Sequence, residues 1–388
     1  MMHRYRTKEQ GATALIIVMF SVLMFITITV SFMKIMAQEQ MRTNDNELSQ
    51  GAYDSALAGV EDGKRVLAMC QAGVVAACNL LDAETPICNI VSEAGLAVAD
   101  NNEVYLKTTA GANGRDFEQA YTCVKIRRDT DDYRGSLAKD GSTVVPLTVA
   151  SDQSFDQVHI YWFAKDLSNP SKLPTPQNAV SPIFSSVSDW NGLSTTKPPV
   201  LRVQLMQFSS NGFKPEDFDS NGNAHTLYLY PTRNPAGFST TSFSLDGRRA
   251  GTLAPVLTRC NTTYSFNGYA CQMTIALPDA VDMAGDKTKR RAYLRLMSIY
   301  NETEFRVVLE KSSGEIVKFH GVQPSIDSTG RAADVFRRVE AKVEFVDPNE
   351  GLLYPRATVD ITNNFCKSFV IGIVPADYSA GTCSPTGP

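Results

Sequence analysis

Residues 12–33, ATALIIVMFSVLMFITITVSFM, form a run of 22 residues without a charged side chain. Arg4, Arg6 and Lys8 precede the run, and Lys34 ends it. At a rise of about 1.5 Å per residue, a helix of this length spans about 33 Å, which is enough to cross the hydrocarbon core of a bilayer. The basic residues before the run predict a cytoplasmic N-terminus, so we expect the chain after Lys34 to lie outside the membrane.

The residues after this run are expected to continue the same helix. Residues 38–50 are polar, and residues 51–70 (GAYDSALAGVEDGKRVLAMC) are amphipathic. Apolar residues recur there near helical spacing and predict a stripe that docks on a globular domain. The stripe consists of Tyr53, Ala56, Leu57, Val60 and Leu67. Gly51, Gly59 and Gly63 weaken a helix by up to about 1 kcal/mol each, so they indicate bends or close packing against a sheet.

The front of the chain resembles the N-terminus of type IV pilins and pseudopilins. The shared features are a basic leader, a glycine, an unbroken apolar run and an amphipathic continuation, over roughly the first 70 residues. In that family a prepilin peptidase cuts after the glycine, and the new N-terminus begins a helix that sits in the inner membrane and later packs in the pilus core. The resemblance implies a leader at residues 1–11, cleavage between Gly11 and Ala12, and a pilin helix at residues 12–70.

One position departs from the pattern of this family. Major pilins carry a glutamate at the fifth mature residue, which is Ile16 when Ala12 is counted as the first. Such a carboxylate neutralises the buried N-terminal amine of a neighbouring subunit, because an unpaired charge in apolar surroundings is costly. The glutamate is absent from minor pilins of the PilX type and from the large tip pseudopilin of type II secretion. The resemblance is greatest to the PilX type, which favours a minor, tip-located subunit.

Residues 71–388 are expected to form a β-rich ectodomain, so the predicted fold is α+β, with a long helix packed on an antiparallel sheet. Segments such as AYTCVKIRR (120–128) are rich in β-branched and aromatic residues or alternate in polarity. In VFRRVEAKVEFV (335–346), Val339, Ala341, Val343 and Phe345 are expected on one face of a strand. Prolines within residues 166–200 indicate an irregular connection, which is the best candidate for an internal boundary.

Eight cysteines in an exported chain predict disulfides. Cys260 and Cys271 flank a hairpin turn at Asn267-Gly268, and Cys366 and Cys383 would close a C-terminal loop. The remaining four are expected to pair with one another, in an order that their spacing leaves open: Cys70, Cys78, Cys88 and Cys123. Buried free thiols are the alternative.

One segment has the spacing of a calcium loop. It places alternate oxygen ligands around a glycine in the sixth position: Asp217, Asp219, Asn221 and Asn223. The twelfth position is Tyr228 rather than glutamate, so the bidentate ligand is missing. An ordinary Asx-rich turn is therefore the favoured interpretation, and no other cofactor is expected.

The sequence contains no pattern that supports an enzyme. There is no G-x-S-x-G and no glycine-rich phosphate loop. Beyond the leader the histidines are isolated and are interpreted as structural: His159, His225 and His320. The net charge of −4 and the lack of an aromatic and basic platform give no specific signal for nucleic acid.

These features predict a minor pilin in the inner membrane, which is later carried on a cell-surface pilus that serves assembly, adhesion or twitching motility. The expected partners are other pilins and minor pilins, the prepilin peptidase, the inner membrane, and host or surface ligands of the ectodomain. The alternatives are a membrane-anchored adhesin that does not polymerise and the tip pseudopilin of a type II secretion system. A secretory signal peptide is disfavoured, because its apolar region usually has only about 7–15 residues.

Overall fold

The computed structural model describes residues 10–83, 85–101, 103–106, 118–164, 190, 198–207, 224–233, 238–243, 255–261, 263–282 and 292–345. In this part of the chain the helices are α1 (Gln10–Gln71), α2 (Val75–Leu81) and α3 (Ile90–Glu93). The strands form two sheets, one of four and one of 11 strands. The structure confirms an α+β fold with a long N-terminal helix and a largely antiparallel β-rich domain.

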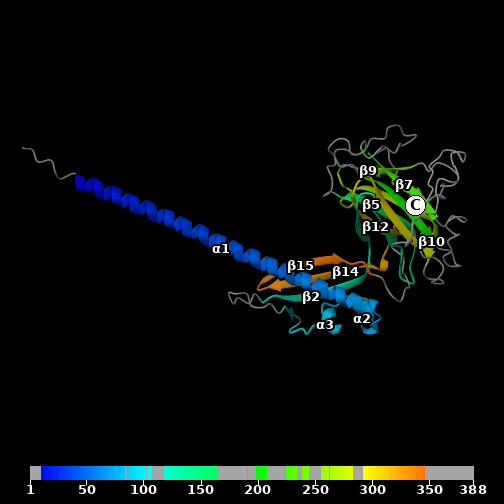
Figure 1. Ribbon diagram of the computed structural model, residues 1–388, viewed down its shortest axis with the longest axis horizontal. Coiled ribbons are helices and arrows are strands. Elements are labelled where there is room, and N and C mark those ends of the chain that lie inside the picture. Colours follow the sequence, from blue (N-terminus) through cyan, green and yellow to red (C-terminus); the bar gives the residue numbers. More distant parts are fainter. Residues whose placement is uncertain are drawn as a thin grey trace, which may run out of the picture. The chain divides into compact units, whose positions relative to one another are not determined.

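Helix α1 has two parts with different surroundings (Figure 1). In the front half, residues 10–47, every side chain that the structure describes is exposed to solvent. In the docked half, residues 48–71, every third or fourth side chain is buried against a sheet. The helix is unbroken between the two halves, so one element joins the apolar run to the folded domain.

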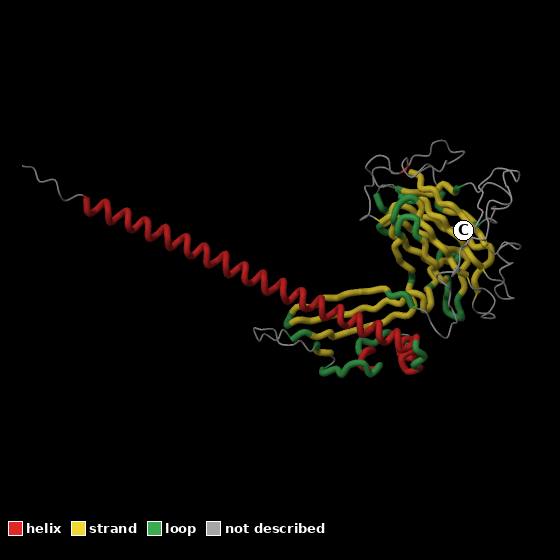
Figure 2. The backbone as a smooth tube through the Cα atoms, in the orientation of Figure 1, coloured by secondary structure: helices red, strands yellow, loops and turns green. Residues whose placement is uncertain are grey.

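The docked half lies on one face of the small sheet (Figure 2). The order of this sheet is β1 (Val104–Tyr105), β2 (Ala120–Thr130), β14 (Phe319–Ala332) and β15 (Val335–Lys342), with every neighbouring pair antiparallel. Val60 and Leu67 of α1 share a core with Val124 and Ile326 of the sheet. The alternation predicted for β15 and the residues just after it is confirmed. Val339, Ala341 and Val343 pack against this core, and Phe345 is buried in it.

Glycines allow the docked half and the small sheet to approach each other at backbone distance. A Cβ atom on Gly330 of β14 would lie 2.2 Å from the carbonyl oxygen of Ala52 and 2.2 Å from the amide nitrogen of Ala56. A Cβ atom on Gly59 would lie 2.3 Å from Ser328 Oγ. The glycines of the docked half therefore mark close packing against a sheet, one of the two expected explanations.

The predicted stripe is wrong for two of its members. Tyr53 and Leu57 are 44% and 37% exposed, because they lie on the side of α1 that faces away from the sheet. The buried face consists mainly of small residues: Gly51, Ala52, Ser55, Ala56, Gly59 and Gly63. Where these residues meet the sheet the approach is too close for large side chains, so this part of the docking face consists of small residues.

The large sheet encloses the main core. Its order is β13 (Ile316–Val317), β12 (Thr303–Glu310), β5 (Ser154–Ala164), β10 (Tyr269–Asp282), β9 (Val256–Cys260), β7 (Ala224–Arg233), β6 (Val200–Gln207), β11 (Ala292–Ile299) and β4 (Ser142–Pro146). In addition, β3 (Tyr133–Leu137) pairs with β12, and β8 (Thr240–Ser242) pairs with β10. The sequence predicted an antiparallel sheet. The pairs β7–β9 and β8–β10 are parallel, so this sheet is mixed.

Gly330→Ala is expected to destabilise the protein by about 1–3 kcal/mol, because the new methyl group must push α1 away from β14. Chemical unfolding of the full chain in detergent, followed by circular dichroism, measures this loss. The matched control is Thr329→Val, since Thr329 points to the other face of the same strand. Its expected effect is within about 0.5 kcal/mol. Equal stability of the two variants would contradict the close approach of helix and sheet.

Candidate functional site

The front half of α1 is the most unusual surface in the described residues. Its large apolar side chains between Leu15 and Met36 are 49–71% exposed. A continuous apolar surface of this length is unfavourable in water and has to be covered by lipid or by other apolar helices. The helix is long and apolar enough to cross a membrane, although a signal sequence near an N-terminus would meet the same criterion.

The helix itself satisfies the hydroxyl groups that the structure describes within the apolar run, those between Ser21 and Ser31. Ser21 donates to the carbonyl of Val18 at 2.8 Å, and Thr27 donates to the carbonyl of Met24 at 2.9 Å. Thr29 and Ser31 donate in the same way to carbonyls four residues earlier, at 2.7 and 2.8 Å. These groups therefore need no water, and they cost little when the run enters an apolar environment.

The predicted cleavage residues lie in the first turns of this helix. Gly11 and Ala12 belong to the backbone of α1, and Ile16 is 53% exposed on it. No carboxylate occurs between residue 12 and Glu39, which pairs with Arg42 at 3.5 Å on the exposed surface. The apolar run therefore offers no negative charge to a neighbouring amine.

Polar contacts fix both the start and the middle of the docked half. Arg337 of β15 donates two hydrogen bonds to Ser49 Oγ, at 2.9 and 2.6 Å, where α1 meets the sheet. The Tyr121 hydroxyl of β2 donates to Asp62 Oδ2 at 2.7 Å. Burial, together with this carboxylate, raises the pKa of Tyr121, so the phenol stays a donor at physiological pH. The point at which α1 leaves the sheet is thus set by specific side chains.

Disulfides are present, as the sequence predicts, and all described cysteines are paired. Cys70, near the end of the docked half, bonds Cys78 of α2. Cys88 bonds Cys123 of β2. The third bond joins Cys260 of β9 to Cys271 of β10, which face each other across the two strands.

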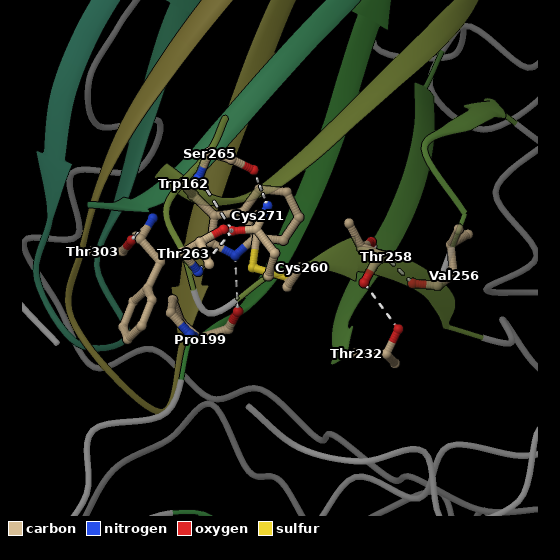
Figure 3. The surroundings of a disulfide bond; sticks show 12 residues. Trp162, Pro199, Thr232, Val256, Thr258, Cys260, Thr263, Ser265, Cys271 and Thr303 are labelled. Atoms are coloured by element: carbon tan, nitrogen blue, oxygen red, sulfur yellow. Dashed lines mark hydrogen bonds between the residues drawn. A yellow bond between two sulfur atoms is a disulfide. The ribbon is translucent and has the colours of Figure 1, made fainter. Parts of the chain in front are cut away.

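Figure 3 shows the surroundings of the third disulfide. The fully buried Trp162 lies close to it, and its indole Nε1 donates to the carbonyl of Pro199 at 3.3 Å. On the neighbouring strands, Thr232 Oγ1 donates to the carbonyl of Thr258 at 3.0 Å. The polar groups around the sulfurs are therefore satisfied within the protein, and this region is a closed core rather than a reactive site.

Asp132 carries the densest charge network in the described residues. Its buried carboxylate accepts hydrogen bonds from Arg306 Nε at 2.6 Å and Arg134 Nε at 2.9 Å, and it pairs with Lys342. Burial by itself would raise the pKa of Asp132, but hydrogen bonds from Lys342 and Arg134 hold it below its ordinary value. Lys342 belongs to β15 and Arg306 to β12, so the network joins residues of both sheets. We interpret it as structural.

The three histidines of the ectodomain have structural contacts. His159 stacks on Tyr161 with ring centroids 4.2 Å apart, and its Nδ1 lies 3.3 Å from Glu310 Oε1. His320 Nδ1 lies 2.7 Å from Asp129 Oδ1, and His225 is buried. No group of three or more potential metal ligands occurs in the described ranges.

Some predicted residues lie outside the described ranges. These are the calcium-loop candidates Asp217, Asp219, Asn221 and Asn223, the cysteines Cys366 and Cys383, and most of the candidate boundary at residues 166–200. The calcium loop and the last disulfide stay predictions. Sequence reasoning missed Gly330 and Asp132. An isolated glycine within a strand is a signal for close backbone approach, whereas no local signal marks Asp132.

No protein-family model and no curated protein matches this chain. Among solved structures, one similar chain comes from work described as "Complete structure of manganese lipoxygenase of Gaeumannomyces graminis and partial structure of zonadhesin of Komagataella pastoris". It is 8% identical, the match covers 64% of this chain and 75% of that chain, and the TM-score is 0.14. This similarity carries no argument about fold or function.

Asp132→Asn is expected to lower stability at pH 7 by about 1–3 kcal/mol, because it removes the buried carboxylate that pairs with the partly exposed Arg306 and Lys342. Since the folded pKa of Asp132 is lowered, its contribution is present above the unfolded value of about 3.9 and is lost as pH falls toward the folded pKa. The variant should therefore lose less stability than the wild type on acidification below about pH 4.

Denaturant unfolding at neutral and acidic pH measures both effects. The matched control is Asp131→Asn, since Asp131 is the exposed neighbour in the same turn. The control should leave stability and its pH dependence nearly unchanged. A wild-type-like acid profile for Asp132→Asn would show that the network does not contribute to stability.

Proposed function

We propose that this protein is a minor, tip-located subunit of a type IV pilus and that it has no enzymatic activity. In this proposal residues 12–33 anchor the precursor in the inner membrane with a cytoplasmic N-terminus, and prepilin peptidase cuts after Gly11. The observation that carries the proposal is the two-part helix α1. In its front half the apolar residues 14–33 are exposed, and its docked half continues without a break onto a sheet.

The α+β architecture supports a pilin-like arrangement. In such an arrangement the front half packs among the helices of other subunits, and the sheets remain outside the helix bundle. The satisfied hydroxyls of the apolar run suit this role, because neither lipid nor a helix bundle supplies water to them. The ectodomain is then free to contact host or environmental surfaces and to serve adhesion, pilus assembly or twitching motility.

The absence of a carboxylate near Ile16 supports a position at the tip. After cleavage, the amine of each subunit is buried in apolar surroundings and needs a negative charge from the neighbour it stacks on. This chain has no acidic residue in its apolar run, so a subunit stacking on it would keep an unpaired amine. A tip subunit avoids this cost, because no subunit follows it in that direction.

Two other functions use the same helix. A membrane-anchored adhesin would keep its leader and would not enter a fibre. The tip pseudopilin of a type II secretion system would be processed in the same way and would differ in its partners. Processing therefore separates the first alternative from the proposal, and location on isolated fibres separates the second.

Gly11→Val is expected to block cleavage, because a branched side chain replaces the glycine at the junction. Mass spectrometry of membrane-extracted protein, from cells with an active prepilin peptidase, measures the N-terminal residue. The wild type should begin at Ala12, and the variant should keep its leader. Thr13→Val is the matched control and should be cut normally. A wild-type protein that retains Met1–Gln10 would contradict the pilin proposal and favour the simple anchor.

Antibodies against the ectodomain should label sheared pili sparsely and at their ends. Ile16→Glu supplies the missing carboxylate, so it should spread the label along the fibre, whereas the neutral Ile16→Gln should not. Electron microscopy with gold-labelled antibody measures the distribution. Dense labelling of wild-type fibres along their length would exclude a tip-located minor subunit.

A further inference from the structure

The disulfides of the described residues differ sharply in their exposure. Cys260 and Cys271 are 0% exposed in the core of the large sheet, and Cys70 and Cys78 are 1% and 8% exposed in the core under α1. Cys88 is exposed, and its partner Cys123 is only half-buried. A thiol or a disulfide can exchange only where another sulfur reaches it, so this difference in exposure has chemical consequences.

The pairing pattern is also simple. Each described bond joins cysteines that follow one another in the sequence, with separations of 8, 35 and 11 residues for Cys70–Cys78, Cys88–Cys123 and Cys260–Cys271. No described bond interleaves with another. Shorter loops close at a lower entropic cost, so the two buried bonds are also the ones whose closure is easiest in an unfolded chain.

We infer that these disulfides form in a fixed order. Cys70–Cys78 and Cys260–Cys271 close first, on the incompletely folded chain, because the finished cores shut out any oxidant. Cys88–Cys123 closes last, at the surface of the folded protein. The oxidant is a disulfide-bonded protein of the thiol-exchange class on the outer side of the membrane. This location rests on the proposed function, whereas the order rests on burial and loop length.

The chemistry of each closure is two successive exchanges. A cysteine thiolate of this chain attacks the disulfide of the oxidant, which forms a mixed disulfide and releases one thiolate of the oxidant. The second cysteine of the pair then attacks this chain's own sulfur in the mixed disulfide, which releases the second thiolate. Two thiols of this chain lose two protons and two electrons, and the disulfide of the oxidant becomes a dithiol.

Consecutive pairing has a consequence for the partners of the chain. Cysteines that are oxidised as they emerge from the membrane meet their native partners first. The described bonds therefore need an oxidant but no disulfide isomerase. The last bond can also reopen without opening a core, because Cys88 lies outside both buried clusters. Reduction would remove only the covalent link between Cys88 and β2, because Ile90 and Val91 stay packed in the core under α1 and the amide of Val124 still donates to the carbonyl of Cys88 at 2.9 Å.

Oxidative refolding of the purified full chain in detergent micelles tests the order. The reduced, denatured chain is refolded with oxidised glutathione, quenched with acid at intervals, alkylated and mapped by mass spectrometry. Cys70–Cys78 and Cys260–Cys271 should appear before Cys88–Cys123. Appearance of Cys88–Cys123 before either buried bond, or together with them, would overturn the inference.

Reduction of the native protein separates burial from loop length. Mild dithiothreitol followed by alkylation should modify Cys88 and Cys123 at least about tenfold faster than the four buried cysteines, while circular dichroism stays native. Equal rates in the folded protein would overturn the assignment. The control variant Cys88→Ser/Cys123→Ser should then show no fast-reacting cysteine among those the structure describes.

Expression in exporting bacterial cells tests the partner. Loss of the thiol oxidase should leave the described cysteines reduced, and loss of the disulfide isomerase should not change the native pairing. A requirement for the isomerase would contradict the inference. Cysteines that remain reduced in cells with both enzymes would contradict the export proposed for this chain, and the two experiments on the purified protein would still decide the order.

Discussion

Gly330 brings the backbone of β14 against the backbone of α1, and the position of the helix on the small sheet depends on this contact. A methyl group there would lie 2.2 Å from main-chain atoms of α1, which cannot rotate away as a side chain can. Gly59 and Gly63 make similarly close approaches to Ser328 and Ile326. The interface therefore tolerates little volume on either side, and its stability comes from many short contacts rather than from a few large side chains.

This constraint explains which parts of the fold could be predicted from the sequence. The apolar run and the alternation in β15 were predictable, because each is a local period of one element. The docking face was mispredicted at Tyr53 and Leu57, since a pattern of large apolar residues says nothing about how closely a partner approaches. The small residues of the docked half carry the interface instead, and their meaning becomes clear only beside β14.

The features of the candidate site also fall into those that a local sequence pattern predicts and those that it does not. The lack of a carboxylate near Ile16 is visible in the sequence, and so is the hydroxyl content of the apolar run. The network around Asp132 is not, because Arg306 and Lys342 are brought to it from strands that are far apart in the sequence. A local sequence pattern identifies a helix surface that lies in an apolar environment. A buried charge network depends on the complete fold and produces no periodic pattern in the sequence.

The contact at the start of the docked half also sets how far the sheet lies from the apolar run. Arg337 holds α1 at Ser49, so residues 34–47 remain outside the docked half. As helix they extend over about 21 Å. If residues 12–33 cross the bilayer, the headgroup region on one side takes up only about 5–8 Å of this length. The sheet then clears the membrane surface by about 13 Å or more. A spacer of this kind explains why residues 38–47 need no apolar face, since they pack neither on lipid tails nor on the sheet.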